Sequence, residues 1–351
     1  MAALISSAKG GRWALIAAAF LARATAQDAP ASVAESLALE VRTVFESARK
    51  AVVRIEATDQ RGPLSGTGFF VDPSGTIFTS YTIGGESTDI LVYCGTQKFP
   101  ARRLLADPRS GVAVLKVDAE TPFITLSDSR ALAVGAPMVI VGYPMDLPAS
   151  PSFGCVSGFD IKYLDRYFAT RHIRANVPVQ RGQGGAPLLN MRGEAVGILI
   201  SGLDQGSACF SLPIEAAQKV QKDFVRFGEL RPGWLGVGVE TAQTALAGST
   251  AEINALNLGA PGEKAGLRSG DVLLELGTRK IASPEDVLDA SFFIAAEDEV
   301  KVRVVRGGKT IEFTVTAADR PNTSVRTAGD IPSFAPAGGA DLRGPALDLD
   351  R

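Results

Sequence analysis

The side chains that could do acid–base or nucleophilic chemistry are few in this chain. Its 351 residues include a single histidine, His172, and three cysteines, Cys94, Cys155 and Cys209. A Ser-His-Asp site needs a histidine to take the proton of the serine, so only His172 could serve as its base. The single histidine also excludes a zinc site built on histidines, and no cysteine spacing resembles a metal site. We therefore predict no metal and no other cofactor.

Two segments in the C-terminal half carry a binding motif. Segment 259–276 (GAPGEKAGLRSGDVLLEL) has glycines that permit tight turns before a strand, and Trp234-Leu235-Gly236-Val237 lies upstream of it. Both strongly resemble bacterial PDZ domains. The resemblance implies that backbone N–H groups of Trp234 to Val237 bind the carboxylate of a peptide or protein C-terminus, while the peptide adds a strand to the sheet edge. The alternative is a structural turn with a buried tryptophan.

Shorter motifs between residues 52 and 213 follow the order of a trypsin-type protease domain. They are Gly66-Thr67-Gly68-Phe69, Asp107-Pro108-Arg109, Val112-Ala113-Val114-Leu115-Lys116, Gly142-Tyr143-Pro144, Val156-Ser157, and the glycine-rich segment Gly182-Gln183-Gly184-Gly185-Ala186-Pro187-Leu188. In this order they resemble the HtrA/Deg family, which are exported serine proteases with C-terminal PDZ domains. The resemblance implies a mainly β fold, with a trypsin-like double β-barrel followed by an α+β PDZ domain.

The three catalytic positions of that family hold other residues here. The resemblance puts Thr82 in the place of the histidine, Gly111 in that of the aspartate and Gly184 in that of the serine. A threonine has no group that titrates near neutral pH, and His172 lies on the strand that enters the glycine-rich loop, whereas the base must come from the other barrel. We therefore predict that the chain is not an enzyme but a catalytically inactive homologue, a pseudoprotease.

The glycine-rich loop has a further implication. Gly182 and Gly184 retain the backbone of the family's oxyanion nest, whose N–H groups bind a carbonyl oxygen. Collapse of the loop is the alternative.

Three functions follow from these motifs. The first is an exported scaffold that binds peptides or proteins through its PDZ domain. The second is a serine-type endopeptidase of the cell envelope with a non-standard active site, in which Ser152, Ser157, Ser201 or Cys155 works with His172. The third is a regulatory subunit of active HtrA relatives. It would form hetero-oligomers, and a homo-oligomer is also open.

The spacing of apolar residues and the positions of turn residues predict the helices and strands that must position these motifs. Residues 34–50 and 213–228 have helical apolar spacing, and short β-rich runs separated by turns lie between them. Ser283-Pro284-Glu285-Asp286-Val287 supplies an N-cap, a proline and early acids, and so begins the helix that flanks the PDZ groove. The predicted domains are 34–228 for the barrels and 231–320 for the PDZ domain. A disordered tail is predicted over 322–351, which is poor in large apolar residues.

Charge and the N-terminus indicate where the protein works. The net charge is −2, from 36 basic and 38 acidic residues, which disfavours nucleic-acid binding. Residues 1–26 read as a signal peptide, with an apolar run that ends at Ala22 and an Ala24-Thr25-Ala26 cleavage signal. An uncleaved anchor is the alternative, because Arg23 lies close to that signal. We expect an exported, periplasmic protein with no membrane span in the mature chain. Its cysteines are expected to be small buried residues, with a Cys155–Cys209 disulfide left open.

Overall fold

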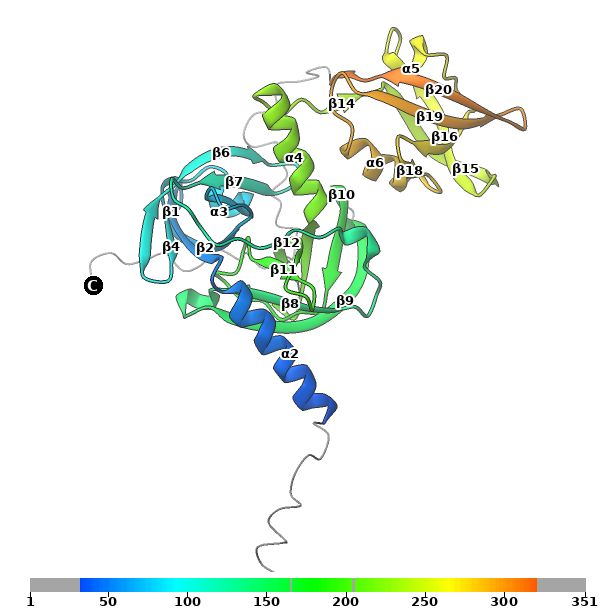
Figure 1. Cartoon of the computed structure of the whole chain (residues 1–351). Coiled ribbons are helices and arrows are strands. Elements are labelled where there is room, and N and C mark those ends of the chain that lie inside the picture. Colours follow the sequence, from blue (N-terminus) through cyan, green and yellow to red (C-terminus); the bar gives the residue numbers. More distant parts are fainter. Residues whose placement is uncertain (1–31, 165, 204–205, 321–351) are drawn as a thin grey trace, which may run out of the picture.

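The structure is a computed structural model that describes residues 32–164, 166–203 and 206–320. It is mainly β, with two barrel-like domains followed by a smaller α+β domain (Figure 1). The predicted fold class is therefore confirmed. The predicted signal peptide and the whole of the predicted C-terminal tail lie outside the described residues.

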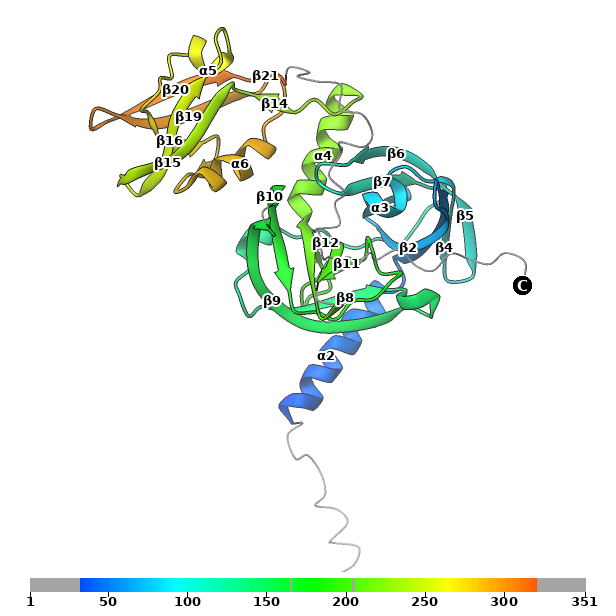
Figure 2. The ribbon, with the colours of Figure 1, turned by 180° about the vertical axis from the view of Figure 1, so that it is seen from behind.

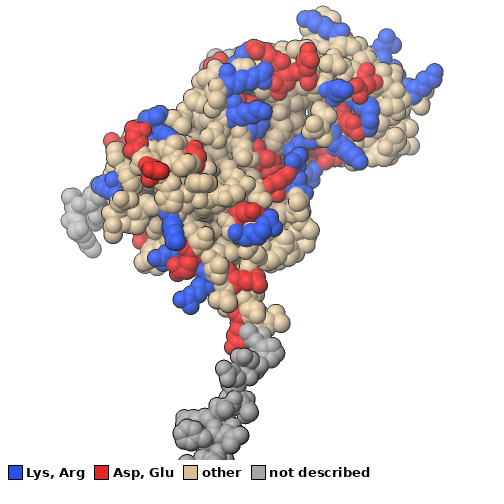
Figure 3. Space-filling view, viewed as in Figure 1, with Lys and Arg blue, Asp and Glu red and all other residues tan. Residues whose placement is uncertain are grey.

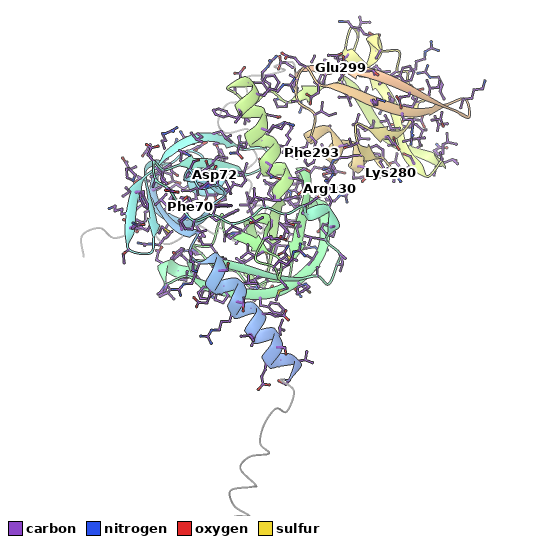
Figure 4. The ribbon with its side chains drawn as sticks, viewed as in Figure 1. Phe70, Asp72, Arg130, Lys280, Phe293 and Glu299 are labelled. Atoms are coloured by element: carbon purple, nitrogen blue, oxygen red, sulfur yellow. The ribbon has the colours of Figure 1, made fainter. Side chains whose placement is uncertain are left out.

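The first barrel-like domain is an antiparallel sheet with strand order β5-β4-β1-β2-β3-β7-β6. Its strands are β1 (Val52–Asp59), β2 (Gly62–Phe70), β3 (Thr76–Ser80), β4 (Thr88–Cys94), β5 (Gln97–Pro100), β6 (Arg102–Asp107) and β7 (Val112–Lys116). β2 and β3 pair as an antiparallel hairpin, in line with the predicted short β-rich runs separated by turns. Asp72 closes its turn, because its carboxylate accepts a hydrogen bond from the amide of Ser74 at 2.8 Å (Figure 4).

The second domain is a closed barrel with strand order β10-β13-β12-β11-β8-β9. Its strands are β8 (Pro137–Gly142), β9 (Ser150–Tyr163), β10 (Arg166–Ala175), β11 (Pro187–Leu189), β12 (Ala195–Leu203) and β13 (Ala208–Pro213). The glycine-rich loop connects β10 to β11 and faces the first domain, since the amide of Thr67 donates to the carbonyl oxygen of Gly184 at 2.9 Å. The cleft between two barrels is where a trypsin-type fold places its active site.

Short helical segments complete these two domains. They are α2 (Val33–Ala48), α3 (Tyr81–Gly84), η1 (Ser129–Ala131), η2 (Pro144–Asp146) and α4 (Ile214–Phe227). The predicted helices at 34–50 and 213–228 correspond to α2 and α4. α4 ends at Gly228, whose φ of +75° suits glycine and whose amide donates to the carbonyl oxygen of Phe224.

Helix α2 begins with a capping box, because Ser32 and Glu35 each accept a hydrogen bond from the amide of the other. Only Val44 and Ala48 of this helix are fully buried. Its N-terminal half therefore extends away from the barrels, on the side opposite the third domain (Figures 1 and 2). Among the described residues, no helix is long and apolar enough to cross a membrane.

The third domain is built on a sheet with the order β15-β16-β17-β19-β20, in which β18 pairs with β17. Its elements are β14 (Gly233–Trp234), β15 (Val237–Leu246), β16 (Ser249–Leu256), α5 (Pro261–Lys264), β17 (Val272–Leu276), β18 (Arg279–Lys280), α6 (Pro284–Phe292), β19 (Glu299–Arg306), β20 (Lys309–Thr316) and β21 (Ala318–Asp319). As predicted, Ser283 caps α6, and its hydroxyl accepts from the amide of Asp286. Val287 and Ala290 of α6 are buried in the core of this domain.

A second flank of α6 contacts the barrels. Phe292 is buried in the apolar cluster of the barrels, with the cations of Arg109 and Lys219 at 5.8 and 5.5 Å from its ring centre. Arg171 on β10 forms an ion pair with Asp286 at 2.7 Å. Charges of both signs gather along this junction (Figure 3). The third domain is therefore docked on the second barrel through the helix that was predicted to flank its groove.

Candidate functional site

The segment from Trp234 to Val237 lies at the start of an edge strand. Trp234 is in β14, which pairs with β21, and Val237 begins β15, which pairs only with β16 among the described strands. The outer edge of β15 is therefore open to a further strand. Leu235 is buried, and Val237 and Val239 pack partly against the same core, so the region beside this edge is apolar.

Hydrogen bonds fix the direction in which this loop presents its backbone. The carbonyl oxygen of Leu235 accepts from the amide of Gly262 at 2.8 Å, and that of Gly236 accepts from Asn257 at 2.9 Å. Outside the regular strands, no backbone hydrogen bond of the described residues uses the amide of Leu235 or Gly236 as a donor. The loop therefore has its carbonyl groups paired and two donors available, which is the arrangement that binds a carboxylate.

Gly236 cannot be another residue in this conformation. Its φ is +73°, and a Cβ there would lie 2.2 Å from the Cβ of Ala260. The close approach holds the loop against α5, so both the sign of φ and the available space require glycine.

The structure brings together the three positions that the sequence relates to a catalytic triad. Thr82 lies in α3, directly after Tyr81, whose amide donates to the carbonyl oxygen of Gly111 at 2.6 Å. On the other side, a Cβ on Gly185 would lie 2.7 Å from the amide nitrogen of Ser80. Residues 80–82 therefore lie between Gly111 and the glycine-rich loop that contains Gly184.

Hydroxyl groups and an aliphatic side chain line this region. The Ser80 and Thr82 hydroxyl oxygens are 2.9 Å apart. Gly111 has a φ of +80°, and a Cβ there would lie 3.2 Å from the side chain of Ile200, so the space beside it is apolar. A carboxylate in that space would lose its hydration without gaining a partner.

The glycine-rich loop has backbone amides that are not used in backbone hydrogen bonds among the described residues. The amides of Gln183, Gly185 and Ala186 donate to backbone carbonyl groups, whereas no backbone hydrogen bond of the described residues uses the amide of Gly182 or Gly184. Gly182 has a φ of +87°, and its carbonyl oxygen accepts from the hydroxyl of Thr67 at 2.7 Å. Two backbone donors, the amides of Gly182 and Gly184, are therefore available at the predicted oxyanion nest.

His172 lies apart from this region, in a buried aromatic cluster on β10. Its ring stacks on Phe168 with centres 4.3 Å apart, and Nδ1 lies 2.9 Å from the carbonyl oxygen of Thr170. Burial lowers the pKa of His172 to about 4, so the ring is neutral at neutral pH. Nε2 has no hydrogen-bond partner among the described residues. His172 therefore activates none of the nucleophiles considered for it, which were Ser152, Ser157, Ser201 and Cys155.

The three cysteines are free. Cys209 is buried, and burial raises the pKa of its thiol to about 12. Cys94, at the end of β4, and Cys155, within β9, are only partly buried. The expectation of three buried cysteines is therefore right for Cys209 and wrong for the other two, and the structure has no Cys155–Cys209 disulfide. The described residues contain no cluster of side chains that could hold a metal ion.

Comparison with known proteins supports both parts of the resemblance. Residues 66–198 match the trypsin-like peptidase domain, and residues 233–317 match the PDZ domain. The chain is 31% identical over 286 residues to a probable periplasmic serine endoprotease DegP-like of Halomonas elongata, an alignment that covers 78% of this chain and 60% of the relative. The chain belongs to the HtrA/Deg family. A similarly named protein of Chlamydia trachomatis is 29% identical over 275 residues, which cover 75% of this chain and 55% of the relative.

Solved structures of this family share the fold. The HtrA-type protease AlgW with tripeptide gives a TM-score of 0.68 at 20% identity, over 80% of this chain and 97% of that one. A serine endoprotease from Yersinia pestis gives 0.59 at 21% identity, over 84% of this chain and 100% of that one. The HtrA/Deg chain described here spans only 55–60% of the length of the first two curated relatives.

These names correct one prediction and confirm another. The prediction that the HtrA/Deg chain is not an enzyme is wrong, because relatives that align with about three quarters of it are named serine endoproteases. That prediction depended on three side chains, whereas the similarity extends over both barrels and the PDZ domain. The expected periplasmic location is confirmed, since the same relatives are named as periplasmic.

Sequence reasoning missed two features of this region. The contact between α6 and β10 joins residues more than a hundred positions apart, and no local pattern in the sequence indicates it. The left-handed backbone of Met145 and Asp146, beside the glycine-rich loop, had no signal in the sequence.

Proposed function

We propose that this chain binds exported polypeptides in the periplasm by their carboxyl termini, through Trp234, Leu235, Gly236, Val237 and the open edge of β15. The observation that carries the proposal is the pair of available amides at Leu235 and Gly236, directly ahead of an edge strand. A C-terminal carboxylate accepts from such amides, and the preceding residues of the ligand extend the sheet. The AlgW structures, which are named as complexes with a tripeptide and a decapeptide, agree with peptide binding in this fold.

Hydrogen exchange tests this proposal at the residues concerned. Adding a short peptide with an apolar, free C-terminus to the full chain should slow exchange of the Leu235 and Gly236 amides and of the outer-edge amides of β15. Exchange that slows elsewhere but not at these amides would refute the assigned site.

A second candidate function is endopeptidase activity with a non-standard active site. We propose that Thr82, Gly111 and Gly184 correspond to the family's three catalytic positions. The specific observation in favour of hydrolysis is the available donors at Gly182 and Gly184, beside the paired hydroxyl groups of Ser80 and Thr82. Such donors stabilise the oxyanion of a tetrahedral intermediate.

Hydrolysis of an unfolded protein by the purified chain tests this candidate. Replacing both hydroxyl groups in Ser80→Ala/Thr82→Val should abolish turnover. Turnover that survives in the double variant would show that these hydroxyl groups are not part of the site.

Association with itself or with active relatives stays a prediction, which the mass of the assembled protein in solution tests.

A further inference from the structure

Two consecutive residues of β10 hold the PDZ helix α6 against the barrels (Figure 1). The hydroxyl of Thr170 and the amide of Arg171 both donate to one carboxylate oxygen of Asp289, at 2.6 and 2.7 Å. The guanidinium of Arg171 also pairs with Asp286 at 2.7 Å. These three polar contacts across the junction depend on the position of residues 170 and 171, so a shift of this short segment would break them together.

The buried ring of His172 is attached to the same segment. Its Nδ1 lies 2.9 Å from the carbonyl oxygen of Thr170. A carbonyl oxygen only accepts, so Nδ1 carries the proton of the neutral ring and Nε2 carries the lone pair. Thr170 therefore contacts His172 through its carbonyl group and Asp289 through its hydroxyl group, and it connects the ring to the junction.

The second ring nitrogen of His172 lies where a proton is costly. The residue is 1% exposed, and Nε2 has no hydrogen-bond partner among the described residues. The ring stacks on Phe168, which in turn contacts Phe210 with ring centres 5.0 Å apart. A proton on Nε2 would create a buried cation whose N–H group lacks an acceptor. A movement of the segment that brings Nε2 into water removes this cost.

The charged groups around His172 do not compensate for a second proton on its ring. Asp289 attracts that proton, but one oxygen of Asp289 is already paired with Arg279 at 2.6 Å. Asp160, opposite His172 in the β9–β10 ladder, pairs with Arg174 at 2.8 Å. Burial therefore outweighs the attraction and lowers the pKa of His172 to about 4. The other charged or titratable groups on β10 and on the elements packed against it, within the described residues, are Arg166, Tyr167 and Arg171 on β10, Cys155, Lys162 and Tyr163 on β9, Cys209 on β13, and Glu285 and Asp286 on α6.

We propose that His172 is a pH-sensitive switch of this junction, in which a proton on Nε2 displaces Thr170 and Arg171 and releases α6 from β10. In acid the PDZ domain then separates from the barrels while each domain stays folded. The switch concerns how the two parts of the chain are held together. It therefore goes beyond the proposed function and does not depend on whether the chain binds a peptide.

The direction and size of the effect follow from the proton that His172 binds on release. The pKa of His172 is about 4 when the ring is buried, against an ordinary value of 6.5 in water. Between these values the released form binds a proton that the docked form does not, so a lower pH favours release. The ratio of released to docked protein should therefore rise about twentyfold from pH 7 to pH 5 and hardly change above pH 7.

Hydrogen exchange at the amide of Arg171 measures this ratio in the full chain, because that amide donates across the junction to Asp289. The exchange rate at each pH is compared with the rate of an unstructured amide at the same pH, which gives the protection of the Arg171 amide. This protection should fall about twentyfold from pH 7 to pH 5 and return when the pH is raised again. The far-ultraviolet circular dichroism should stay the same at pH 5, because both domains remain folded.

Two variants remove the titrating group from this site. His172→Phe keeps the stacking on Phe168, His172→Gln keeps a polar side chain, and neither binds a proton, so protection in each should change less than about twofold over the same pH range. If one variant does not fold, the other provides the comparison. Tyr167→Phe, at an exposed position of the same strand, is the matched control and should respond to pH as the natural chain does.

Equal loss of protection in the natural chain and in a folded His172 variant would assign the pH response to the carboxylates of α6 and overturn the switch. Protection that stays constant between pH 7 and pH 5 in the natural chain would overturn it as well.

Discussion

Asp289 of the PDZ helix accepts a hydrogen bond from the hydroxyl of Thr170 on barrel strand β10, with 2.6 Å between the two oxygens. The same carboxylate oxygen accepts from the amide of Arg171 at 2.7 Å, and the other pairs with Arg279 at 2.6 Å. Thr170 and Asp289 are both buried, so one carboxylate joins donors from two domains. In the same junction, Phe293 follows α6 close to α4 (Figure 4).

We expect Asp289→Ala to loosen the PDZ domain from the barrels. The substitution leaves the buried hydroxyl of Thr170 and the partly buried amide of Arg171 without an acceptor, which should cost about 2–3 kcal/mol. Limited proteolysis near the α4–β14 connection and the radius of gyration in solution should both increase. Glu312→Ala is the matched control, because it breaks an exposed pair with Lys301 and should cost less than about 1 kcal/mol. Equal effects of the two variants would show that Asp289 does not hold the junction.

Folding stability should depend on pH through His172. Its pKa is about 4 in the folded protein, lowered by burial, against an ordinary value of 6.5. Between these values the unfolded chain binds a proton that the folded chain does not. The free energy of unfolding is therefore highest above pH 6.5, and it decreases as the pH falls towards 4.

The loss in the free energy of unfolding follows from the difference between the two pKa values of His172 and is about 3 kcal/mol. Urea unfolding at several pH values should show this loss in the natural chain, and His172→Phe should reduce the slope between pH 6.5 and 4. Phenylalanine keeps the stacking on Phe168 and carries no proton. An unchanged slope in His172→Phe would assign the pH dependence to other groups.

Gly236→Ala should damage both the stability of the PDZ domain and peptide binding. The new methyl group would contact Ala260, and residue 236 has a positive φ, so we expect the free energy of unfolding to fall by about 3 kcal/mol. Gly248→Ala has a similar φ of +86° with no atom within 4 Å of its Cβ, and should cost about 1 kcal/mol. Thermal unfolding of both variants provides the comparison, and equal losses would mean that the contact with α5 is unimportant.

Gly111→Asp should destabilise the barrels even though it introduces the residue type that the family resemblance implies at this position. The position has a φ of +80° and its Cβ would face the side chain of Ile200, so an aspartate there is strained and loses hydration against an aliphatic group. We expect the free energy of unfolding to fall by about 3 kcal/mol. The control Gly135→Asp should lower it by only about 1 kcal/mol, because position 135 has a similar φ of +89° but open space around its Cβ. Similar losses would show that Ile200 does not determine the cost.

Local chemistry explains which parts of this structure could be predicted. Asp72 closes the β2–β3 turn and Ser283 caps α6 through neighbours two to three residues away, so the sequence alone places both elements. The PDZ loop is recognisable for the same reason, because its glycines determine its backbone. Asp289 and Thr170, in contrast, are 119 positions apart, and only the packing of α6 on β10 brings them together.

The candidate active site shows the same limit. Sequence reasoning names Thr82, Gly111 and Gly184, and it has no means to place Ile200 beside Gly111 or to detect the strain at Met145. It also bases the prediction of inactivity on three positions, whereas the similarity to a serine endoprotease extends over 78% of the chain.

The central claim is that the PDZ loop binds a C-terminal carboxylate, and the affinity ratio of one short peptide in its free and amidated forms tests it most directly. The free form should bind the full chain with a Kd on the order of micromolar, as expected for a short strand added to an edge. The amidated form should bind at least about tenfold more weakly, because it loses the charge-assisted bonds to the Leu235 and Gly236 amides. Equal dissociation constants for the two forms would contradict the account.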